Sequence, residues 1–312
     1  MNLSCSLRNE GKVSDVYVLG MDVGGTNCRL GLVDRTLQAQ NVIVYPSKDI
    51  WSSDDSIESL AEVIRGYLKV YDSKDEVTAI SIGFPSVVNK ARTKLLSSTN
   101  FPGLDDVLII DELSVRLGKK VIIDHDAYYL LLYDIEKSGI VNEGTIAGCY
   151  FGTGLGNAVY INGSPYYGKN GAACELGHIP IPGSDYPCSC GNKGCIEMFS
   201  CGKALERIQE QYFPETPINE LFLKHSAEKV LTDFVDYIAV AVSTEVNILD
   251  PDYVFLGGGI IHMDNFPKEQ LVSHIISHTR KPYPAENLNL LFSSAAPESG
   301  IIGAAAAAFR SL

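Results

Sequence analysis

Residues 16–33 read VYVLGMDVGGTNCRLGLV and decide the fold that we predict for this chain of 312 residues. The apolar, β-branched run from Val16 to Met21 predicts a buried strand, and Arg29 to Val33 predicts a second strand. Gly24 and Gly25 predict the turn that joins the two strands into a hairpin. Because glycine has no Cβ, the backbone N–H groups of such a turn can approach and bind an anion.

The tip of this hairpin carries the groups that phosphoryl transfer uses. A carboxylate is available for Mg²⁺, together with a hydroxyl and a guanidinium. An ordinary β-turn with an incidental aspartate explains the same residues if the chain has no second hairpin. With a second hairpin, we expect the tip to bind the phosphates of ATP through Asp22, Gly24, Gly25, Thr26 and Arg29.

The second half of the chain repeats the pattern. A strand is predicted over Ile146–Phe151, a glycine turn over 152–156 and a returning strand over Ala158–Ile161. Further along, Tyr253–Leu256 predicts a strand that leads into three glycines. These segments add the candidate ATP contacts Gly152, Thr153, Gly154, Gly257, Gly258 and Gly259.

A strand–glycine turn–strand unit in each half is the organisation of the actin and hexokinase superfamily. We therefore predict an α/β fold of two actin-like (ribonuclease H-like) domains with a cleft between them. The first domain is predicted over residues 1–123 plus 297–312, with the C-terminal helix packed back on it. The second is predicted over residues 124–296 and contains a cysteine-rich loop.

Two familiar nucleotide-binding motifs do not fit the chain. A P-loop requires the pattern GxxxxGK followed by Ser or Thr, which is absent. The spacing Gly152-x-Gly154-x-Gly156 resembles a dinucleotide fingerprint, but that fingerprint opens a helix, and here the following residues predict a strand. A nicotinamide-dependent dehydrogenase is therefore disfavoured.

Composition narrows the partners and the compartment. The formal net charge of −13 repels phosphate backbones, so we expect no nucleic-acid partner. The sequence has no run of ~18 or more apolar residues, so we expect no membrane span. Residues 1–15 lack the apolar stretch of a secretory signal, and we expect the protein to be cytoplasmic, where thiols stay reduced.

Three cysteines crowd into one loop that follows a histidine, in the pattern GHx₉CxCGx₂GC. One imidazole and three thiolates complete a tetrahedral zinc set without a position for water, which is typical of a structural site. The alternative is three buried or reactive cysteines near an unrelated histidine. We predict Zn²⁺ bound by His178, Cys188, Cys190 and Cys195.

A zinc ion in this loop also orders its surroundings. The ring of His178 is fixed by the metal, and its second nitrogen is then held in one orientation. Glu175 and Glu197 lie close to the predicted ligands in sequence. The three side chains therefore form a rigid patch that suits hydrogen bonds to neighbouring sugar hydroxyls.

Together these stretches resemble the ROK family (repressor, open reading frame, kinase) over nearly the whole chain. The segments that carry the resemblance are DVGGT at 22–26, GFP at 83–85, NFPG at 100–103, Asp126, GTG at 152–154, ELGH at 175–178, the cysteine loop through Glu197, and LGGG at 256–259. Within the family the chain is similar to the D-allose kinases, in the tracts at 171–180, 247–251 and 263–267. The resemblance implies a homodimer that transfers the γ-phosphoryl group of ATP to O6 of an aldohexose, most specifically D-allose.

The resemblance also implies roles for individual residues. Asp126 falls at the position of the family's general base, which accepts the O6 proton, a role typically worth ~10²–10⁴ in rate. From the residues alone, Asp126 serves equally well as the N-cap of a helix predicted over 127–137. The implied hexose contacts are Asn100, His125, Asp126, Glu175, His178 and Glu197.

The chain departs from the family at two positions beside the base. His125 and Tyr128 stand where the family usually has asparagines. The usual amide partner of the sugar hydroxyls is therefore missing, which puts glucose specificity in doubt. Because a site built for one hydroxyl geometry rejects the wrong epimer, the change is consistent with a C3 epimer of glucose such as allose.

Other functions remain open at this point. A repressor of the same family needs a helix-turn-helix module of several dozen residues ahead of the first hairpin, where about 20 residues precede it here. A sugar sensor without turnover keeps the same fold. Glucokinase, fructokinase and N-acetylhexosamine kinase activities share the same predicted machinery.

Overall fold

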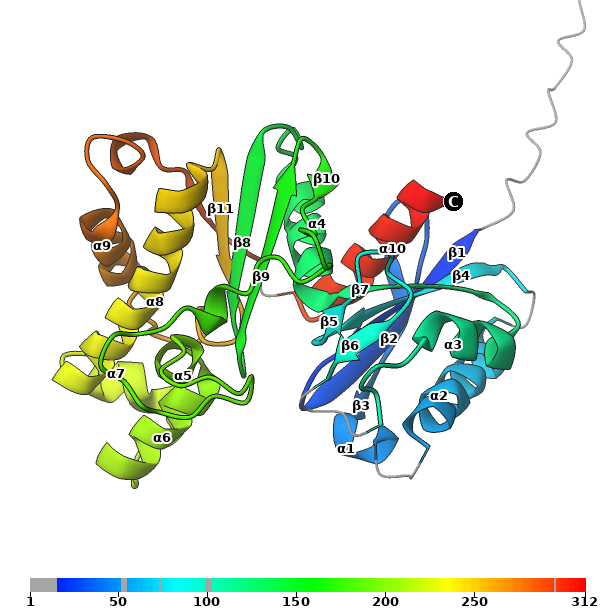
Figure 1. Ribbon diagram of the computed structural model, residues 1–312. Coiled ribbons are helices and arrows are strands. Elements are labelled where there is room, and N and C mark those ends of the chain that lie inside the picture. Colours follow the sequence, from blue (N-terminus) through cyan, green and yellow to red (C-terminus); the bar gives the residue numbers. More distant parts are fainter. Residues whose placement is uncertain (1–15, 52–54, 73–74, 99–102, 295) are drawn as a thin grey trace, which may run out of the picture.

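The computed structural model describes residues 16–51, 55–72, 75–98, 103–294 and 296–312. Two five-stranded sheets form the centres of two domains, and a pair of helices lies between them (Figure 1). Each sheet begins with an antiparallel hairpin and continues with parallel strands. The described part of the chain contains no helix long and apolar enough to cross a membrane.

The first sheet has the strand order β3-β2-β1-β4-β7. β1 pairs antiparallel with β2 and parallel with β4, which in turn pairs parallel with β7. The hairpin predicted from residues 16–33 is therefore confirmed. The strands are β1 (Tyr17–Val23), β2 (Asn27–Val33), β3 (Ala39–Pro46), β4 (Val77–Phe84) and β7 (Lys120–His125), beside a small hairpin of β5 (Val87–Val88) and β6 (Leu95–Ser97).

Helices cover both faces of the first sheet. On one face lie α2 (Ser56–Tyr71) and α3 (Ile109–Leu117), with the short α1 (Ser47–Ile50) at the end of β3. The N-cap of α2 is Asp55, whose side chain accepts the Glu58 N–H at 2.9 Å. Its buried face follows helical spacing through Leu60, Ala61, Ile64 and Tyr67.

The second sheet repeats the first with the order β10-β9-β8-β11-β12. β8 and β9 form its hairpin, and β11 and β12 continue it as parallel strands. The predicted strands at 146–151, 158–161 and 253–256 are confirmed. The bounds are β8 (Thr145–Phe151), β9 (Leu155–Ile161), β10 (Ser164–Pro165), β11 (Tyr253–Gly257) and β12 (Leu290–Phe292).

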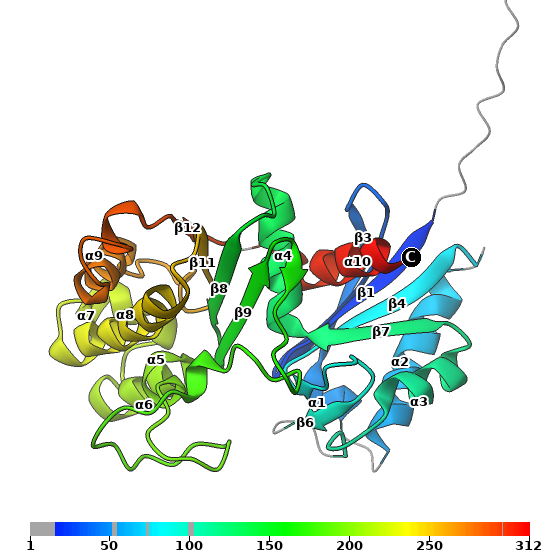
Figure 2. The same ribbon diagram turned by 45° about the horizontal axis from the view of Figure 1, so that its top comes forward.

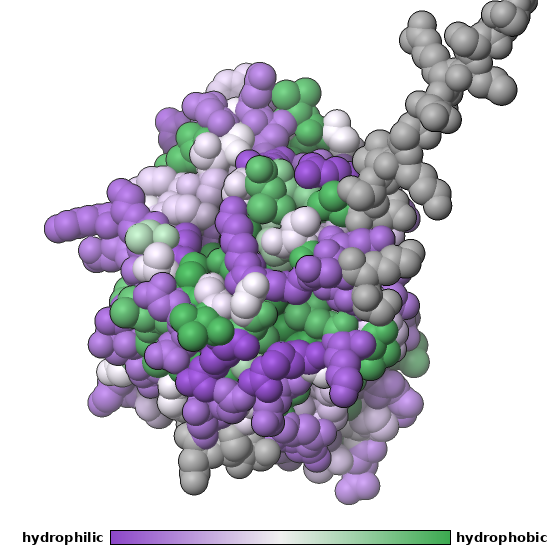
Figure 3. Space-filling view, turned by 90° about the vertical axis from the view of Figure 1, so that its right-hand side faces the viewer, coloured by the Kyte–Doolittle hydropathy of each residue, from purple (hydrophilic) through white to green (hydrophobic). Residues whose placement is uncertain are grey.

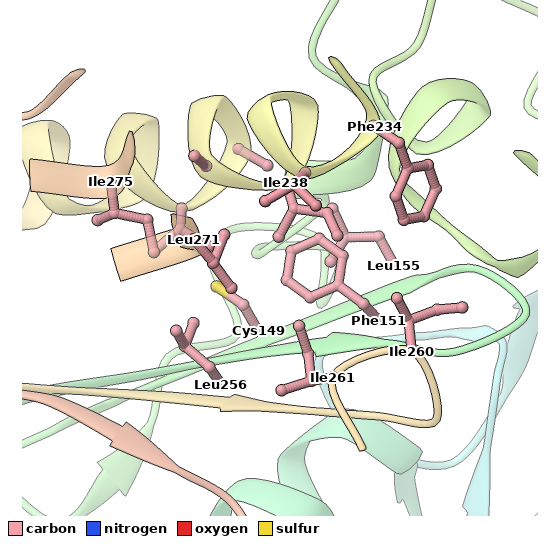
Figure 4. Packing of buried hydrophobic residues seen from close by; sticks show 14 of the residues in the cluster. Cys149, Phe151, Leu155, Phe234, Ile238, Leu256, Ile260, Ile261, Leu271 and Ile275 are labelled. Carbon is pink, nitrogen blue, oxygen red and sulfur yellow. The ribbon is translucent and has the colours of Figure 1, made fainter. Parts of the chain in front are cut away.

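The outer face of the second sheet is covered by α8 (Lys229–Leu249) and α9 (Lys268–His278). Figure 4 shows this core, in which Phe151, Leu256 and Ile260 from the sheet side meet Ile238 and Leu271 from the helices. The remaining helical elements of the second domain are η1 (Leu176–His178), α5 (Glu197–Ser200), α6 (Gly202–Tyr212), η2 (Ile218–Glu220), α7 (Leu221–His225) and η3 (Ala285–Asn287).

Two helices occupy the space between the sheets: α4 (Asp126–Ser138) and α10 (Ser299–Ser311), seen side by side in Figure 2. α4 packs its apolar side on the second sheet, whereas Ile301 and Ala305 of α10 pack on Val18 and Ala79 of the first sheet. A Cβ at Gly303 would overlap the carbonyl of Tyr129, so glycine lets the two helices touch. The chain thus crosses between the domains beside this helix pair.

The surface on the side of the first domain is mixed in character. Figure 3 shows hydrophobic patches there among a larger hydrophilic surface. Exposed valines on the edge strand β3, Val42 and Val44, are part of the apolar fraction of the protein's surface. An acidic chain with a surface of this kind is typical of a globular protein.

Candidate active site between two glycine turns

The first glycine turn joins β1 to β2 at the edge of the first domain. It is closed by the Gly24 N–H, which donates to the Asn27 carbonyl at 3.0 Å. The Ser47 hydroxyl supports the turn from the start of α1 by donating to the Gly24 carbonyl at 2.6 Å. Gly25 and Thr26, at the tip, are exposed and free to meet a ligand.

Asp22 is the half-buried penultimate residue of β1 and lies directly behind this turn. Burial and the negative charge of Asp126 raise the pKa of its carboxyl to about 6, while Arg29 opposes the shift. The Arg29 Nη1 lies 3.5 Å from the Asp22 Oδ2. α10 begins against the same carboxylate, since a Cβ at Gly300 would lie 2.8 Å from the Asp22 Cγ. An anionic oxygen held in this way suits Mg²⁺.

The second glycine turn, between β8 and β9, faces the first across a cleft of about 430 Å³. The cleft is the feature that brings residues from both domains together. Most of the predicted ATP contacts line it, including Arg29 and Thr153. The lining residues are Gly24, Gly25, Thr26, Asn27, Arg29, Gly152, Thr153, Gly202, Glu206, Ile218, Gly259 and Ile260.

The other glycines predicted as ATP contacts do not line this cleft. Each of them lies where close packing leaves no room for a side chain. Gly258 has φ +92°, and a Cβ there would overlap the Phe151 backbone, which lets β11 turn closely over β8. Gly257 packs against Ser293 and Tyr150. Gly154 lies against the carboxylate of Glu197, where a Cβ would come within 2.7 Å of Oε2. These glycines therefore allow the close packing of the segments that surround the cleft.

The sequence did not point to the start of α6 as part of the cleft. The Gly202 N–H donates to the Gly152 carbonyl at 2.7 Å, so the helix begins directly on the second turn. Glu206, one turn further along α6, also lines the cleft. The two segments are about 50 residues apart in the chain, and no local pattern of the sequence connects them.

Asp126 is the first residue of α4, directly after β7. The N-cap of this helix is His125, whose Nδ1 accepts the Ala127 N–H at 3.2 Å, so the interpretation of Asp126 as the N-cap is wrong. The Asp126 Oδ1 also accepts the Ala127 N–H, at 2.7 Å, and lies 3.1 Å from the His125 Nδ1. Because its charge raises the pKa of Asp22, Asp126 lies within electrostatic reach of that carboxylate.

The predicted hexose contacts of the second domain lie around the cysteine loop. His178 ends η1, and its Nε2 lies 3.6 Å from the Glu175 Oε2. Glu197 begins α5, and its Oε2 accepts the Leu155 N–H at 2.8 Å. Within the described residues, no hydrogen bond or ion pair joins these three side chains to Asp126. Asn100 lies outside the residues that the structure describes.

The cysteine loop brings the four predicted zinc ligands together. Their ligand atoms all lie within 4.8 Å of one another. The His178 Nδ1 lies 3.6 Å from the Cys188 Sγ, and the Cys190 Sγ lies 3.6 Å from the Cys195 Sγ. Tetrahedral bonds of about 2.3 Å to sulfur and 2.0–2.1 Å to nitrogen require edges of roughly this length. The donor set therefore fits Zn²⁺.

The backbone around this cluster is suited to wrapping an ion. Gly191 and Gly194 have φ of +92° and +70°, which L side chains rarely adopt. The Gly194 carbonyl accepts the Ile181 N–H at 2.7 Å, closing the loop on itself. The His178 Nδ1 faces the cysteines and its Nε2 faces Glu175, so a zinc ion would be held by Nδ1 and would leave Nε2 available.

Tyr128, one of the two departures beside Asp126, is buried in the second domain. Its hydroxyl donates to the Tyr166 carbonyl at 2.5 Å and lies 3.5 Å from the Cys174 Sγ. The side chain therefore supports the segment that leads to Glu175. It does not replace the missing amide as a free polar group.

The chain is similar to one family of known proteins over most of its length. The model of the ROK family matches residues 18–310. Among curated relatives, an N-acetyl-D-glucosamine kinase of Haemophilus influenzae is 29% identical over 262 residues, covering 78% of this chain and 84% of the relative. A glucokinase of Thermotoga maritima is 27% identical over 312 residues, covering 92% and 96%.

Solved structures show the same architecture. A ROK glucokinase of Streptomyces griseus in complex with glucose and AMPPNP matches with a TM-score of 0.76 at 21% identity, covering 94% of this chain and 99% of that one. A ROK hexokinase of Thermus thermophilus matches with a TM-score of 0.75 at 26% identity, covering 95% and 99%. These likenesses confirm the predicted fold class of two actin-like α/β domains.

Proposed function

The chain belongs to the ROK family, and from that premise we propose that it is an ATP-dependent kinase acting on O6 of an aldohexose, with D-allose as the preferred substrate. The observation that carries the proposal is the cleft lined by a glycine turn from each domain, with Asp22 and Asp126 behind it. The similarity to curated hexose and hexosamine kinases over most of the chain supports the reaction class.

The chemistry follows from the positions of these groups. The exposed backbone at Gly25 and Thr153 is open to phosphate oxygens, the half-buried Gly152 lines the cleft beside it, and Arg29 adds a positive charge. Mg²⁺, which neutralises phosphate charge when bound, would be held on this side by Asp22. Asp126 accepts the proton of the O6 hydroxyl as that oxygen attacks the γ-phosphorus and ADP leaves.

Hexose recognition falls to the side chains around the zinc loop. We propose that Glu175, His178 and Glu197 bind ring hydroxyls, and that His125 and Asn100 are further hexose contacts. His178 would be fixed by bound zinc, so its Nε2 would contact a hydroxyl without the imidazole losing rotamer freedom on hexose binding. A donor set of one imidazole and three thiolates would leave zinc no position for water, so we assign the metal a structural role and no part in phosphoryl transfer.

The choice of D-allose rests on the two departures beside Asp126. With a tyrosine at 128 whose hydroxyl is already bonded to Tyr166, the site has one polar partner fewer for a ring hydroxyl. If the site has no hydrogen-bond partner for the 3-hydroxyl of glucose, it gains no affinity from that hydroxyl. Binding the C3 epimer, D-allose, then costs no hydrogen bond. The curated relatives act on glucose and N-acetyl-D-glucosamine by name, so the proposal is specific to this chain.

A coupled ADP-release assay over a panel of hexoses tests the proposal. We expect the highest kcat/KM for D-allose, measured against D-glucose, D-mannose, D-fructose, N-acetyl-D-glucosamine and N-acetyl-D-mannosamine. A preference for D-glucose or an N-acetylhexosamine would refute D-allose while keeping the hexokinase reaction. ATP binding without turnover of any hexose would refute the kinase and favour a sugar sensor.

The proposal includes the organisation of the whole protein. We propose a first domain of residues 1–123 plus 297–312 and a second of 124–296, working as a homodimer in the cytoplasm. The packing of α10 on the first sheet supports the discontinuous first domain. Light scattering measures the mass in solution, and a mass of one chain would refute the dimer.

A further inference from the structure

Arg92 connects the two domains from the small hairpin of the first domain. It lies between β5 and β6, and its side chain is only 12% exposed. Its Cζ lies 3.4 Å from the centroid of the Tyr167 ring, which belongs to the second domain. A guanidinium is planar and weakly hydrated, so it stacks on an aromatic face at little desolvation cost.

Asp124 completes this contact from β7, two residues before Asp126. Its Oδ1 lies 3.2 Å from the Arg92 Nε, and its Oδ2 accepts the Tyr167 hydroxyl at 2.5 Å. Burial raises the pKa of the Asp124 carboxyl, and the charge of Arg92 opposes that shift. Removal of one member of a buried ion pair leaves the other charge unpaired and destabilises the protein. We therefore treat Arg92, Asp124 and Tyr167 as one coupled group.

The segment 164–175 is held to the same region at two more points. The Tyr166 carbonyl accepts the hydroxyl of Tyr128, on α4, at 2.5 Å. Gly171 has φ +89°, and a Cβ there would overlap the backbone at residues 88–90, so the two domains touch through glycine. The Arg92 Nη1 also donates to the Gly171 carbonyl at 3.3 Å. Four residues further on, this segment ends at Glu175.

We propose that Arg92 and Tyr167 are positioning residues for the hexose. Through Asp124, they fix the segment that ends at Glu175 against the strand end that carries Asp126. The distance between the side chain that binds ring hydroxyls and the base that accepts the O6 proton is thereby set. This inference rests on the proposed hexokinase reaction. It concerns the binding of the hexose and not the binding of ATP. Neither residue lines the cleft between the glycine turns.

Two conservative variants test this role. Arg92→Lys keeps the charge but loses the planar stack, and Tyr167→Phe keeps the ring but loses the hydrogen bond to Asp124. We expect the KM for the hexose to rise about tenfold or more in each, because a displaced Glu175 no longer meets the ring hydroxyls at hydrogen-bond distance, and losing a hydrogen bond to a charged group weakens binding about tenfold or more. The KM for ATP should stay within about twofold of the wild-type value.

Matched controls come from the first domain. Arg35 lies over the Phe309 ring with its Cζ 5.2 Å from the centroid, and the Tyr67 hydroxyl donates to the Asn41 carbonyl at 2.9 Å. Arg35→Lys and Tyr67→Phe make the same chemical changes away from the hexose. We expect both KM values to stay within about twofold of wild type in these controls.

The outcomes separate this inference from the proposed function. A hexose KM that is unchanged in Tyr167→Phe, or that rises in parallel with the KM for ATP, would overturn the positioning role. If Arg92→Lys fails to fold, Tyr167→Phe decides alone. If the wild type turns over no hexose, the proposed function fails, and calorimetric hexose affinity then tests the inference: an unchanged Kd in Tyr167→Phe would overturn it.

Discussion

At the scale of single residues, Asp126 is placed by the junction between a strand and a helix. His125 caps α4, so the carboxylate of Asp126 is not needed to begin the helix. One of its oxygens accepts the Ala127 N–H, which fixes the side chain near Asp22. A carboxylate without a capping duty, oriented by a backbone donor, is suited to accept a proton from a substrate.

We expect Asp126→Asn to lower kcat by about 10²–10⁴, because an amide cannot accept the O6 proton. Hexose affinity should change little, since the amide keeps the size of the side chain. Stopped-flow or coupled kinetics measure kcat, and calorimetry measures hexose binding. Asp111→Asn, on the exposed first turn of α3, is the control and should retain wild-type kcat. Near-normal kcat in Asp126→Asn would assign the base to another residue.

Glycines show what a sequence leaves open at the scale of a residue. Gly24, Gly25 and Gly152 line the cleft, as we predicted for ATP contacts. Gly258 was predicted from the same kind of pattern, yet its missing Cβ faces the Phe151 backbone. A sequence shows that a position lacks a side chain. Only the fold shows whether a ligand or another strand occupies the space.

At the scale of elements, the cysteine loop is the segment that the sequence describes best. All four candidate ligands lie between residues 178 and 195, so their spacing alone constrains the geometry. The contact of Arg92 with Asp124 and Tyr167 could not be predicted in this way. Those three residues come from a hairpin, a strand end and a loop, and only the docking of the two domains brings them together.

We expect one zinc ion per chain, and removal by a chelator should lower the melting temperature because metal binding contributes folding free energy. Cys195→Ser should lose most of the zinc and show the same destabilisation. Cys201→Ser is the control: this cysteine is also buried but lies outside the cluster, and the variant should keep its zinc. Elemental analysis and thermal unfolding are the measurements. A metal-free wild type with undiminished stability would contradict the assignment.

At the scale of the whole molecule, one buried carboxylate joins parts of the chain that cross between the domains. Asp134 lies on α4 and is 3% exposed, and its Oδ2 accepts the Tyr150 hydroxyl of β8 at 2.8 Å. Ser293 and Ser294, on the way to α10, also donate to it. Burial nevertheless dominates and raises the pKa of Asp134 to about 6. Compared with the unfolded chain, the folded protein therefore favours the protonated carboxyl.

The stability contributed by Asp134 is fully present below its unfolded pKa of 3.8 and is lost as pH rises through about 6. At about 1.4 kcal/mol per pH unit between the two pKa values, the loss is on the order of 3 kcal/mol. We expect Asp134→Asn to remove this pH dependence. Urea unfolding of wild type and variant between pH 4 and 7 gives the free energy of unfolding of each protein. The titration of other groups cancels in the difference between the two free energies. A difference that does not vary with pH would contradict the prediction.

The overall architecture was predictable because the hairpin pattern occurs twice and each occurrence is local. The docking of the halves was not predictable to the same degree. Gly303 permits α10 to touch α4 only because the carbonyl of Tyr129 lies at that point. Nothing in the alanine-rich sequence of α10 identifies that neighbour. The residues that connect the domains therefore became evident only in the structure.

The packing of α10 has a consequence for the order in which a ribosome supplies the parts of this protein. Val18, Val33 and Ala79 are made early, but Ile301, Ile302 and Ala305, which cover them, follow more than 200 residues later. A nascent chain shorter than about 300 residues leaves that apolar face of the first sheet bare. The sheet that is synthesised first is therefore covered on this face only after the strands of the second sheet have been made.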